Sequence, residues 1–554
     1  MLLKKLFKRD KLSDKISEEV TYADLAILGL IIIVGAVIGF RKFGNNQPKP
    51  EDKTTYGVAF SQTPIAELPT AKDSQVVELK NGDIYNLTAS IVKKQIGNSV
   101  VKMLAYNGMI PGPLIKVSQG AEVTLNFTNN TDVDTTIHSH GVRLDNKFDG
   151  VPDVTQKAVR PGESFTYKIK FPDAGMYWYH PHIREDYAQE LGLYGNYLVT
   201  PNDPHYWSPV NRETALFLDD ILIENGRIAT FNKATADHTL MGRFGNTMLV
   251  NGETDYELVA KIGEVVRFYL TNSANTRTLN VKLPGAKMKL VGGDGGKYER
   301  EQYVDSVLLG PSERAVVEVL FDKAGKFSLI HQTPDKTYTL GTIDVSTDKI
   351  GTSYAKEFDI LRTNQDIISS IDPLRPYFGK PADKSLVMAV NMMGRGSGMG
   401  GQHMMGNGMM MGNSAMTMPG DVKKIEWEDD MGSMNINSTS KTLTWQLTDQ
   451  ATGNSNMDID WKFKVGDKVK VKIFNDPNAM HPMQHPIHFH GQRFLVLSTN
   501  GVKNDNLVWK DTALVQTGDT VELLVDMTNP GTWMAHCHIA EHLESGMMMK
   551  FEVL

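Results

Sequence analysis

Hydrophobic and polar residues alternate with a period of two along most of the chain beyond residue 54, in short runs separated by Gly, Pro, Asn and Asp. This alternation is typical of β-strands that bury one face, and long runs with helical periodicity are almost absent.

Two segments each recur three times. The first reads GAEVTLNFTNN at 120–130, GEVVRFYLTNS at 263–273 and GDKVKVKIFND at 466–476. The second contains a shared glycine, at Gly175, Gly325 and Gly531.

The repeats predict an all-β protein built from three Greek-key β-sandwich domains. We place these domains at residues 54–202, 203–350 and 351–554. The first and third copies of the second segment carry a histidine pair just beyond the shared glycine, whereas the middle copy has Ile330 and Gln332 there. We therefore expect the middle domain to bind no metal at this position.

One uncharged run, LAILGLIIIVGAVIGF at residues 25–40, departs from the alternating pattern. Its length lies between that of a membrane span and that of a signal-peptide core. The long leader at 1–24, and the lack of a small-residue cleavage site in the linker at 41–53, favour an uncleaved transmembrane helix over a cleaved signal or a buried core helix. More basic residues precede the run than follow it, which predicts a cytoplasmic N-terminus and extracytoplasmic domains on the periplasmic or cell-surface side.

Composition adds a candidate chemistry. The 554 residues have a net charge of −7, so there is no basic excess to bind nucleic acid. A single cysteine, Cys537, excludes an intramolecular disulfide. By contrast, 15 histidines and 28 methionines supply imidazole and soft sulfur, the ligands that suit copper.

Histidines gather in four short motifs: HSHG from His138, HPH from His180, HPIHFHG from His485 and HCHIAEHLESGM from His536. Because side chains alternate across a strand, each H-x-H pair presents two imidazoles to one face. By the same rule Cys537 points away from its neighbours and must serve a different metal. His485 and His542 are free to join it, and Met547 can add a weak axial sulfur, which is the ligand set of a blue-copper site.

In this order and with this spacing the four motifs resemble the multicopper oxidases of the laccase and bacterial copper-efflux-oxidase kind, from Tyr56 to Leu554. The resemblance implies cupredoxin-like domains and four copper ions per chain: one type 1, one type 2 and two type 3. It assigns type 1 copper to His485, Cys537, His542 and Met547, and type 2 copper to His138 and His488. It assigns the type 3 pair to His140, His180, His182, His490, His536 and His538.

The resemblance also implies a mechanism. A reductant gives single electrons to the type 1 copper, they pass through Cys537 to its histidine neighbours, and O₂ is reduced to water. Asp149, in the DG after HSHG, matches an acidic residue that supplies protons in the family, and a simple Asp-Gly turn is the alternative. Some relatives carry an acid where this chain has Leu543, so Glu541 or Glu544 is the candidate replacement.

Thirteen of the 28 methionines lie in a glycine-rich insert at 388–434. Its composition is typical of a flexible low-complexity loop. Thioether sulfur prefers Cu(I), and similar inserts mark copper-efflux oxidases, so the insert is a candidate substrate-metal region. The candidate residues are Met404, Met405, Met409, Met410, Met411, Asp429, Asp430, Met431 and Met434.

The leading hypothesis is a membrane-anchored oxidase that uses O₂ to oxidise Cu(I) and protects the cell from copper. A laccase-like oxidase of phenols, or an oxidase of Fe(II) or Mn(II), is the alternative with another small reductant. A copper-binding scaffold or chaperone without turnover is the non-enzyme alternative. A relative of the family that had lost its copper would show substituted ligands, and outside the middle domain none is substituted.

Overall fold

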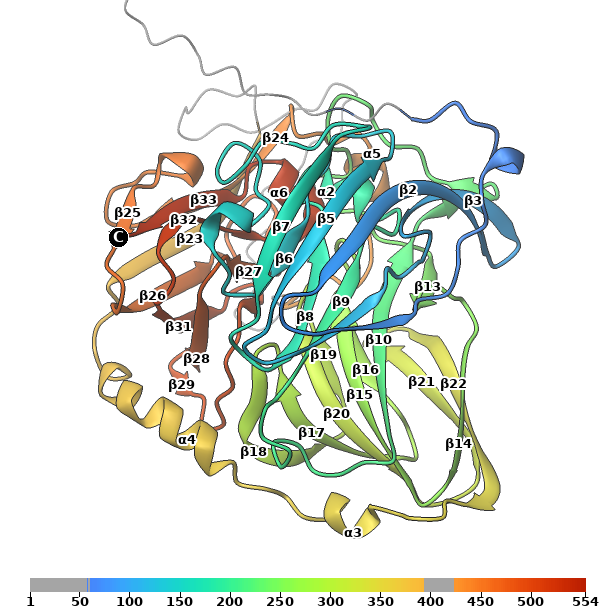
Figure 1. Ribbon diagram of the computed structural model, residues 1–554. Coiled ribbons are helices and arrows are strands. Elements are labelled where there is room, and N and C mark those ends of the chain that lie inside the picture. Colours follow the sequence, from blue (N-terminus) through green and yellow to red (C-terminus); the bar gives the residue numbers. More distant parts are fainter. Residues whose placement is uncertain (1–56, 58–59, 393–422) are drawn as a thin grey trace, which may run out of the picture. The chain divides into compact units, whose positions relative to one another are not determined.

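The structure is a computed structural model that describes residues 57, 60–392 and 423–554 (Figure 1). All of these belong to one compact unit, Tyr56–Leu554. The predicted leader, transmembrane helix and linker (residues 1–53) lie outside the described residues, as do Met404, Met405, Met409, Met410 and Met411. Among the helices that the structure describes, none combines the length and the apolar character needed to cross a membrane.

The first sandwich comprises two sheets with strands between residues 76 and 200. One sheet has the order β3-β2-β5-β7: β2 (Ile84–Ile96), β3 (Ser99–Tyr106), β5 (Glu122–Asn130) and β7 (Ser164–Lys170). The other has the order β1-β4-β9-β8-β6: β1 (Val76–Leu79), β4 (Leu114–Ser118), β6 (His138–His140), β8 (Gly175–His180) and β9 (Gly195–Thr200). The short helix α2 (Glu185–Ala188) lies between β8 and β9 in the chain.

The middle sandwich has its strands between residues 212 and 349. One sheet has the order β13-β10-β15-β20-β17-β18: β10 (Arg212–Ile221), β13 (Thr247–Val250), β15 (Glu264–Asn272), β17 (Lys287–Gly293), β18 (Gly296–Val304) and β20 (Arg314–Phe321). The other has the order β14-β22-β21-β16-β19: β14 (Tyr256–Ile262), β16 (Leu279–Lys282), β19 (Val307–Leu309), β21 (Gly325–Gln332) and β22 (Thr337–Lys349). Strands β11 (Ile223–Glu224) and β12 (Arg227–Ile228) form a separate hairpin.

The third sandwich follows helices α3 (Ala355–Phe358) and α4 (Gln365–Ile371). One sheet has the order β24-β23-β26-β31-β28-β29: β23 (Lys384–Met392), β24 (Leu443–Asp449), β26 (Lys468–Asn475), β28 (Arg493–Thr499), β29 (Val502–Lys503) and β31 (Thr520–Asp526). The other has the order β25-β33-β32-β27-β30: β25 (Trp461–Phe463), β27 (His485–Phe489), β30 (Thr512–Val515), β32 (Gly531–Cys537) and β33 (Met548–Val553). Helices α5 (Gly432–Ile436) and α6 (Ala540–Glu544) belong to its connections.

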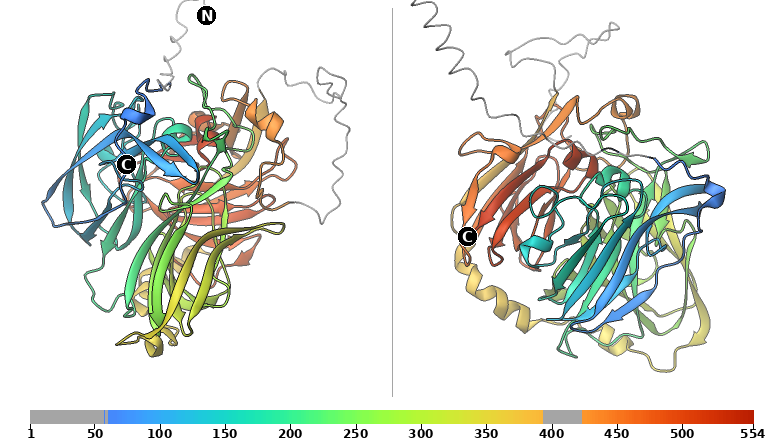
Figure 2. Two further views of the ribbon diagram at one scale, coloured as in Figure 1. Left: turned by 90° about the vertical axis from the view of Figure 1, so that its right-hand side faces the viewer. Right: turned by 45° about the horizontal axis from the view of Figure 1, so that its top comes forward.

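The sequence repeats occupy equivalent places in the three sandwiches, which Figure 2 shows from two further sides. The first repeat forms β5, β15 and β26, each between one parallel and one antiparallel neighbour. The second forms β7, β20 and β31 and then crosses to the opposite sheet as β8, β21 and β32. The shared glycine begins each crossing strand with φ of +154°, +140° and +136°. The predicted fold class of three Greek-key β-sandwiches is confirmed.

Candidate metal centre

The histidine pairs of the first and third sandwiches lie on strands that pair in register. β6 and β8 are antiparallel, with His138 opposite His180. β27 and β32 are antiparallel, with His488 opposite His536. Because side chains two residues apart share a face of a strand, each sandwich presents its imidazoles as a compact group.

The two groups of imidazoles face each other where the sandwiches meet. The His138 ring stacks on His490 with 4.0 Å between centroids, and the His140 ring stacks on His488 at 3.6 Å. Each stack joins one ring from the first sandwich to one from the third. All eight rings are buried: His138, His140, His180, His182, His488, His490, His536 and His538. The cluster therefore exists only when the two sandwiches pack together.

Within this cluster the ring nitrogens form three groups whose members lie within 4.8 Å of one another. The groups are His138, His140 and His488; His140, His180 and His538; and His182, His490 and His536. Each group draws on both sandwiches. The sequence predicts the eight residues together, but only the tertiary structure divides the six expected type 3 ligands into two triads.

The nitrogens that face the interior of the cluster lack hydrogen-bond partners in the described structure: Nδ1 of His140 and Nε2 of His138, His180, His182 and His488. His490 Nε2 and His536 Nε2 lie 2.9 Å apart. Both rings direct Nδ1 to an oxygen elsewhere, so two lone pairs face each other. A buried polar atom without a partner costs about 1–3 kcal/mol. A cation bound by neutral imidazoles removes that cost, so the site fits a metal.

Burial keeps seven of these rings neutral and therefore able to bind a metal. Burial, reinforced by the neighbouring imidazoles, lowers the pKa well below its ordinary value for His140, His180, His182, His488, His490 and His538. Burial also lowers the pKa of His536 to about 4. Neutral imidazole is the form that ligates metals.

Hydrogen bonds at the opposite nitrogen set the ring orientations. His138 Nδ1 donates to the Asp149 carbonyl at 2.7 Å, and His490 Nδ1 donates to Asp149 Oδ2 at 2.8 Å. His180 and His536 donate through Nδ1 to main-chain carbonyls at 2.8 Å. These bonds leave Nε2 pointing into the cluster, as is usual for metal-bound histidines. Asp149 thus lies beside the cluster and touches one ring from each sandwich.

A second group of potential ligands surrounds Cys537. Its Sγ lies 3.5 Å from His485 Nδ1 and 3.8 Å from His542 Nδ1, and the two nitrogens are 3.2 Å apart. Met547 is buried in the same core, and its carbonyl accepts a hydrogen bond from Cys537 N at 3.0 Å. Burial raises the pKa of the Cys537 thiol well above its ordinary value and lowers that of His485 to about 3. A nearby cation is what converts such a thiol to thiolate.

The two groups are joined through Cys537 itself. Its neighbours His536 and His538 belong to different triads of the histidine cluster. In addition, the Cys537 carbonyl accepts the His536 Nδ1 hydrogen bond at 2.8 Å. The Cys537 group is therefore connected to both triads by a few covalent bonds and to one of them by a hydrogen bond as well.

Comparison with known proteins decides the family. Three family models described as Multicopper oxidase match residues 89–204, 221–348 and 428–554, more than half of the chain. The chain belongs to the multicopper oxidases. Such enzymes use copper, and the neutral imidazoles and the thiol described above are ligands of the kind that copper prefers.

This multicopper oxidase has relatives that match most of its length. "Multicopper oxidase mco" of Staphylococcus epidermidis is 27% identical over 482 residues, covering 85% of this chain and 88% of that protein. "Copper resistance protein A" of Escherichia coli is 23% identical over 623 residues, covering 89% and 95%. The crystal structure of a multi-copper oxidase from Pseudomonas Thermotolerans matches with a TM-score of 0.62 and 25% identity, covering 86% of this chain and 100% of that one.

Two of the three acids predicted for the oxidase's proton supply, Glu541 and Glu544, lie on α6, which packs against α2. Glu541 accepts hydrogen bonds from Asn275 and Thr276 of the middle sandwich at 3.2 and 3.1 Å. Glu544 accepts the backbone N–H of Glu185 at 3.2 Å. Burial raises the pKa of both Glu541 and Glu544 to about 7. Neither carboxyl group belongs to a candidate metal group among the described residues.

Glu185, the first residue of α2, was missed by the sequence analysis. Its carboxylate is fully buried, lies 3.5 Å from His182 Nδ1, and has no hydrogen-bond partner at either oxygen in the described structure. The signal was an acid three residues after the HPH motif, where a chain leaving the strand can turn back toward the histidine. Glu185 becomes a candidate functional residue only in the folded chain, because α6 places Glu544 beside it.

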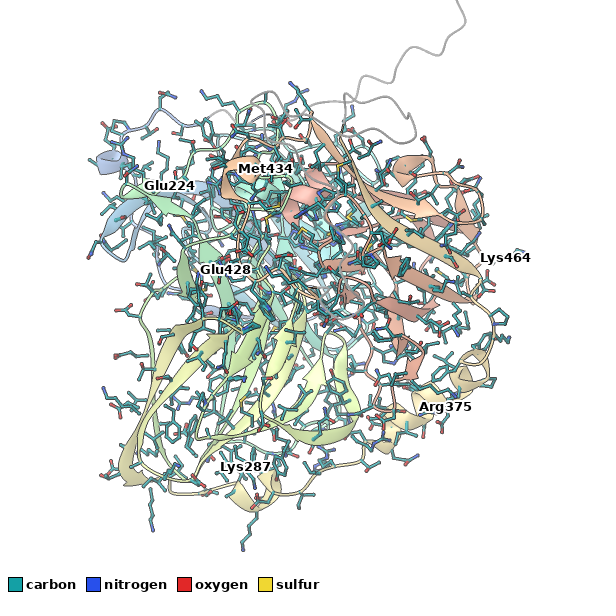
Figure 3. The ribbon with its side chains drawn as sticks, turned by 180° about the vertical axis from the view of Figure 1, so that it is seen from behind. Glu224, Lys287, Arg375, Glu428, Met434 and Lys464 are labelled. Carbon is teal, nitrogen blue, oxygen red and sulfur yellow. The ribbon has the colours of Figure 1, made fainter. Side chains whose placement is uncertain are left out.

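The acidic and methionine candidates at residues 429–434 lie close to the Cys537 sandwich. Asp429 accepts hydrogen bonds from Met431 N and Asn435 Nδ2 at 3.0 and 2.9 Å, and Asp430 pairs with Lys423 at 2.7 Å. Met431 packs against the core that contains Cys537. Met434 is exposed on α5, and Figure 3 labels it together with Glu428.

Proposed function

We propose that this multicopper oxidase oxidises Cu(I) at the expense of O₂ and thereby contributes to copper tolerance. The supporting observation is a combination of thioether and carboxylate groups beside the Cys537 site. The backbone of Glu426 exchanges two hydrogen bonds with Gln484, the residue before His485, at 2.8 and 3.1 Å. The segment leading to Asp429 and Met431 is therefore held against that site, and thioether sulfur favours Cu(I).

We assign the resident copper ions from the groups of converging nitrogens and sulfur. His485, Cys537, His542 and Met547 would hold type 1 copper, and His138 and His488 type 2 copper. The triads His140, His180, His538 and His182, His490, His536 would hold the two type 3 ions, giving four per chain. When bound, these ions supply the one-electron steps by which O₂ becomes water. The chain orients the ligand rings and excludes bulk water from them.

Asp149, Glu541 and Glu544 are the proposed proton-relay residues. Asp149 accepts hydrogen bonds from two ligand rings, so it also holds those rings in place. Glu541 and Glu544 are buried acids whose raised pKa leaves them partly protonated near neutral pH. The carboxyl groups can thus hold a proton at a place from which bulk water is excluded.

The substrate proposal is tested by removing soft sulfur near the type 1 site. Replacing Met431 and Met434 with Leu keeps their bulk but removes the thioethers, and Met457→Leu is the matched control because Met434 and Met457 are both 37% exposed. We expect KM for Cu(I) to rise about tenfold in the double variant, as typical for the loss of groups that support a metal site. KM for a phenol should stay constant in the same O₂-consumption assay.

An equal rise in KM for Cu(I) and for the phenol would contradict the Cu(I) proposal and favour the laccase-like alternative. A higher rate with Fe(II) or Mn(II) than with Cu(I) would favour those ions instead. Copper-loaded, blue protein that consumed no O₂ with any of these reductants would favour a copper-binding scaffold.

We also propose that residues 25–40 anchor the oxidase in a membrane with its sandwiches outside the cytoplasm. The supporting observation is the uncharged run and the excess of basic residues before it. Fractionated cells should retain the full chain in salt-washed membranes, and external protease should reach the sandwiches. Recovery of a shortened chain in the soluble extracytoplasmic fraction would instead indicate a cleaved signal.

A further inference from the structure

Asp511, the residue before β30, is a buried carboxylate that touches the histidine cluster. Its Oδ1 lies 3.0 Å from His140 Nε2, and the neighbouring Thr512 Oγ1 lies 3.1 Å from the same nitrogen. Its backbone carbonyl accepts a hydrogen bond from His488 Nδ1 at 2.8 Å. A single residue of the third sandwich thus contacts two rings that stack on each other.

The middle sandwich holds this carboxylate in place. Arg314, at the start of β20, donates from Nη1 to Asp511 Oδ1 at 2.7 Å and from Nη2 to Oδ2 at 2.5 Å. Its Nε donates to the carbonyl of Met176 in the first sandwich at 3.1 Å. Both side chains are buried, and two parallel N–H···O bonds fix a carboxylate in orientation as well as in distance. Arg314 therefore joins all three sandwiches at one point.

The contacts determine which nitrogen of His140 faces the metal. Asp511 Oδ1 already accepts from Arg314 and from the Thr512 hydroxyl, so it is an acceptor and His140 Nε2 must donate to it. The lone pair of His140 then lies on Nδ1, the nitrogen without a partner inside the cluster. His138, His180, His488, His490 and His536 all have the opposite arrangement, with Nδ1 against an oxygen.

The glycine of HSHG fits the same arrangement. Gly141 has φ of +80°, and a Cβ at this position would lie 2.2 Å from Asp511 Oδ2 and 3.0 Å from Arg314 Nη2. The motif thus leaves space for the paired carboxylate and guanidinium directly beside His140. The HSHG motif of the first sandwich therefore fits against Asp511 of the third sandwich and Arg314 of the middle one.

We propose that Arg314 and Asp511 are positioning residues that fix His140 with Nδ1 toward the type 3 copper site. Through them the middle sandwich, where the described residues form no candidate metal group, sets the ligand geometry between the other two. This inference rests on the copper assignment of the proposed function. It adds a role for a domain that contributes no ligand.

The test is Asp511→Asn, measured by copper content and absorption spectrum. An amide supplies an acceptor at only one of the two positions. With its oxygen at the Oδ1 position an NH2 group faces Arg314 Nη2 and the paired hydrogen bonds are broken, and with its oxygen at the Oδ2 position an NH2 group faces His140 Nε2, so the arrangement that fixes the ring is lost either way. We expect copper affinity of the type 3 site to fall about 10–100-fold, the usual effect of removing a group that orients a ligand. The near-ultraviolet band of the copper pair should fall relative to the blue type 1 band, which reports that the third sandwich is folded.

Asp294→Asn is the matched control. Asp294 is buried in the same network, accepts Arg314 N at 2.8 Å and pairs with Lys510 at 3.0 Å, but has no hydrogen bond to a cluster histidine in the described structure. It should lower thermal stability without changing the ratio of the two bands. Arg314→Lys, which keeps the charge and loses the fork, should lower the ratio less than Asp511→Asn does.

Two outcomes would overturn the inference alone: an unchanged band ratio in Asp511→Asn, or an equal drop in Asp294→Asn. A wild-type chain that takes up no copper would overturn the proposed function and this inference together. The wild-type spectrum therefore separates the two failures.

Discussion

Strands β21 and β32 occupy the same place in the middle and third sandwiches, yet among the described residues only β32 contributes to a candidate metal group. Both begin at the shared glycine and cross from one sheet to the other. Near its end β21 carries Ile330 and Gln332. At the corresponding positions the third sandwich has His536, within β32, and His538, directly after it. The middle sandwich has a continuous apolar core of its own. The two strands pack in the same way in their sheets, and the histidine pair is present in only one of them.

The difference between the two strands does not leave the middle sandwich without a role. It supplies Arg314 to Asp511 and Asn275 and Thr276 to Glu541. These groups contact residues that lie beside the proposed ligands rather than the proposed ligands themselves. A repeat that carries no histidine pair can therefore still shape the centre that its neighbours build.

Cys537→Ser should have the largest effect. It removes the thiol through which the Cys537 group of the third sandwich is connected to the histidine cluster. We expect the blue absorption to vanish and O₂ consumption to fall by roughly 100-fold or more, since oxygen replaces the soft sulfur ligand. Copper content should fall by about one ion per chain while the histidine cluster stays loaded. Retention of the blue band would refute the assignment of Cys537.

Exchanging residues between the copies tests whether the strand alone makes a site. His182→Gln should lower copper affinity of its triad about 10–100-fold. The reverse change, Ile330→His with Gln332→His, should bind no additional copper, because across β21 lies β16 with Val281 and Lys282 and no second pair of imidazoles. Metal analysis after dialysis measures both. An extra copper ion in the double variant would show that one strand is sufficient.

The stability of the copper-free protein at low pH contains a contribution from His331, a buried histidine of the middle sandwich that lies outside the proposed copper ligands. Burial lowers the pKa of His331 to about 4 from an ordinary value near 6.5. As pH falls from about 6.5 toward 4, the unfolded chain binds a proton that the folded chain refuses, so the free energy of unfolding decreases. His331 accounts for about 3 kcal/mol of that loss.

Denaturant titrations of the copper-free protein at several pH values measure this effect. His331→Gln should flatten the curve in this pH range, whereas His205→Gln, at an exposed position, should leave it unchanged. Identical curves for wild type and His331→Gln would contradict the prediction.

The shared glycines should give the smallest effect. Gly325 has open space around it, so an added Cβ meets no neighbour, but its φ of +140° is strained for alanine. We therefore expect Gly325→Ala to lower the free energy of unfolding by about 1 kcal/mol and to leave the copper spectrum unchanged. Gly531→Ala should cost more, because its Cβ would lie 2.5 Å from Asn146 of the first sandwich. Thermal unfolding compares the two variants, and equal losses would show that the contact with Asn146 adds nothing.

The amino-acid sequence by itself determined the strands, the three sandwiches and the histidines and cysteine that gather at the candidate metal centre. Period-two alternation specifies which side chains share a face, and motif spacing places both histidines of each pair on it. That argument is local, because it depends on residues one or two positions apart. It also led to the expectation that Cys537 and its neighbours serve different sites, and the structure places them in different groups.

Only the tertiary structure decided how these parts combine. The division of six rings into two triads, the carboxylate of Glu185 beside His182, and the orientation of His140 by Asp511 and Arg314 depend on segments from different sandwiches. No periodicity or spacing relates such segments. Packing between domains sets the distances between them. A hydrogen bond or a metal ligand must be placed to within a fraction of an ångström, and no local pattern in the sequence gives that precision.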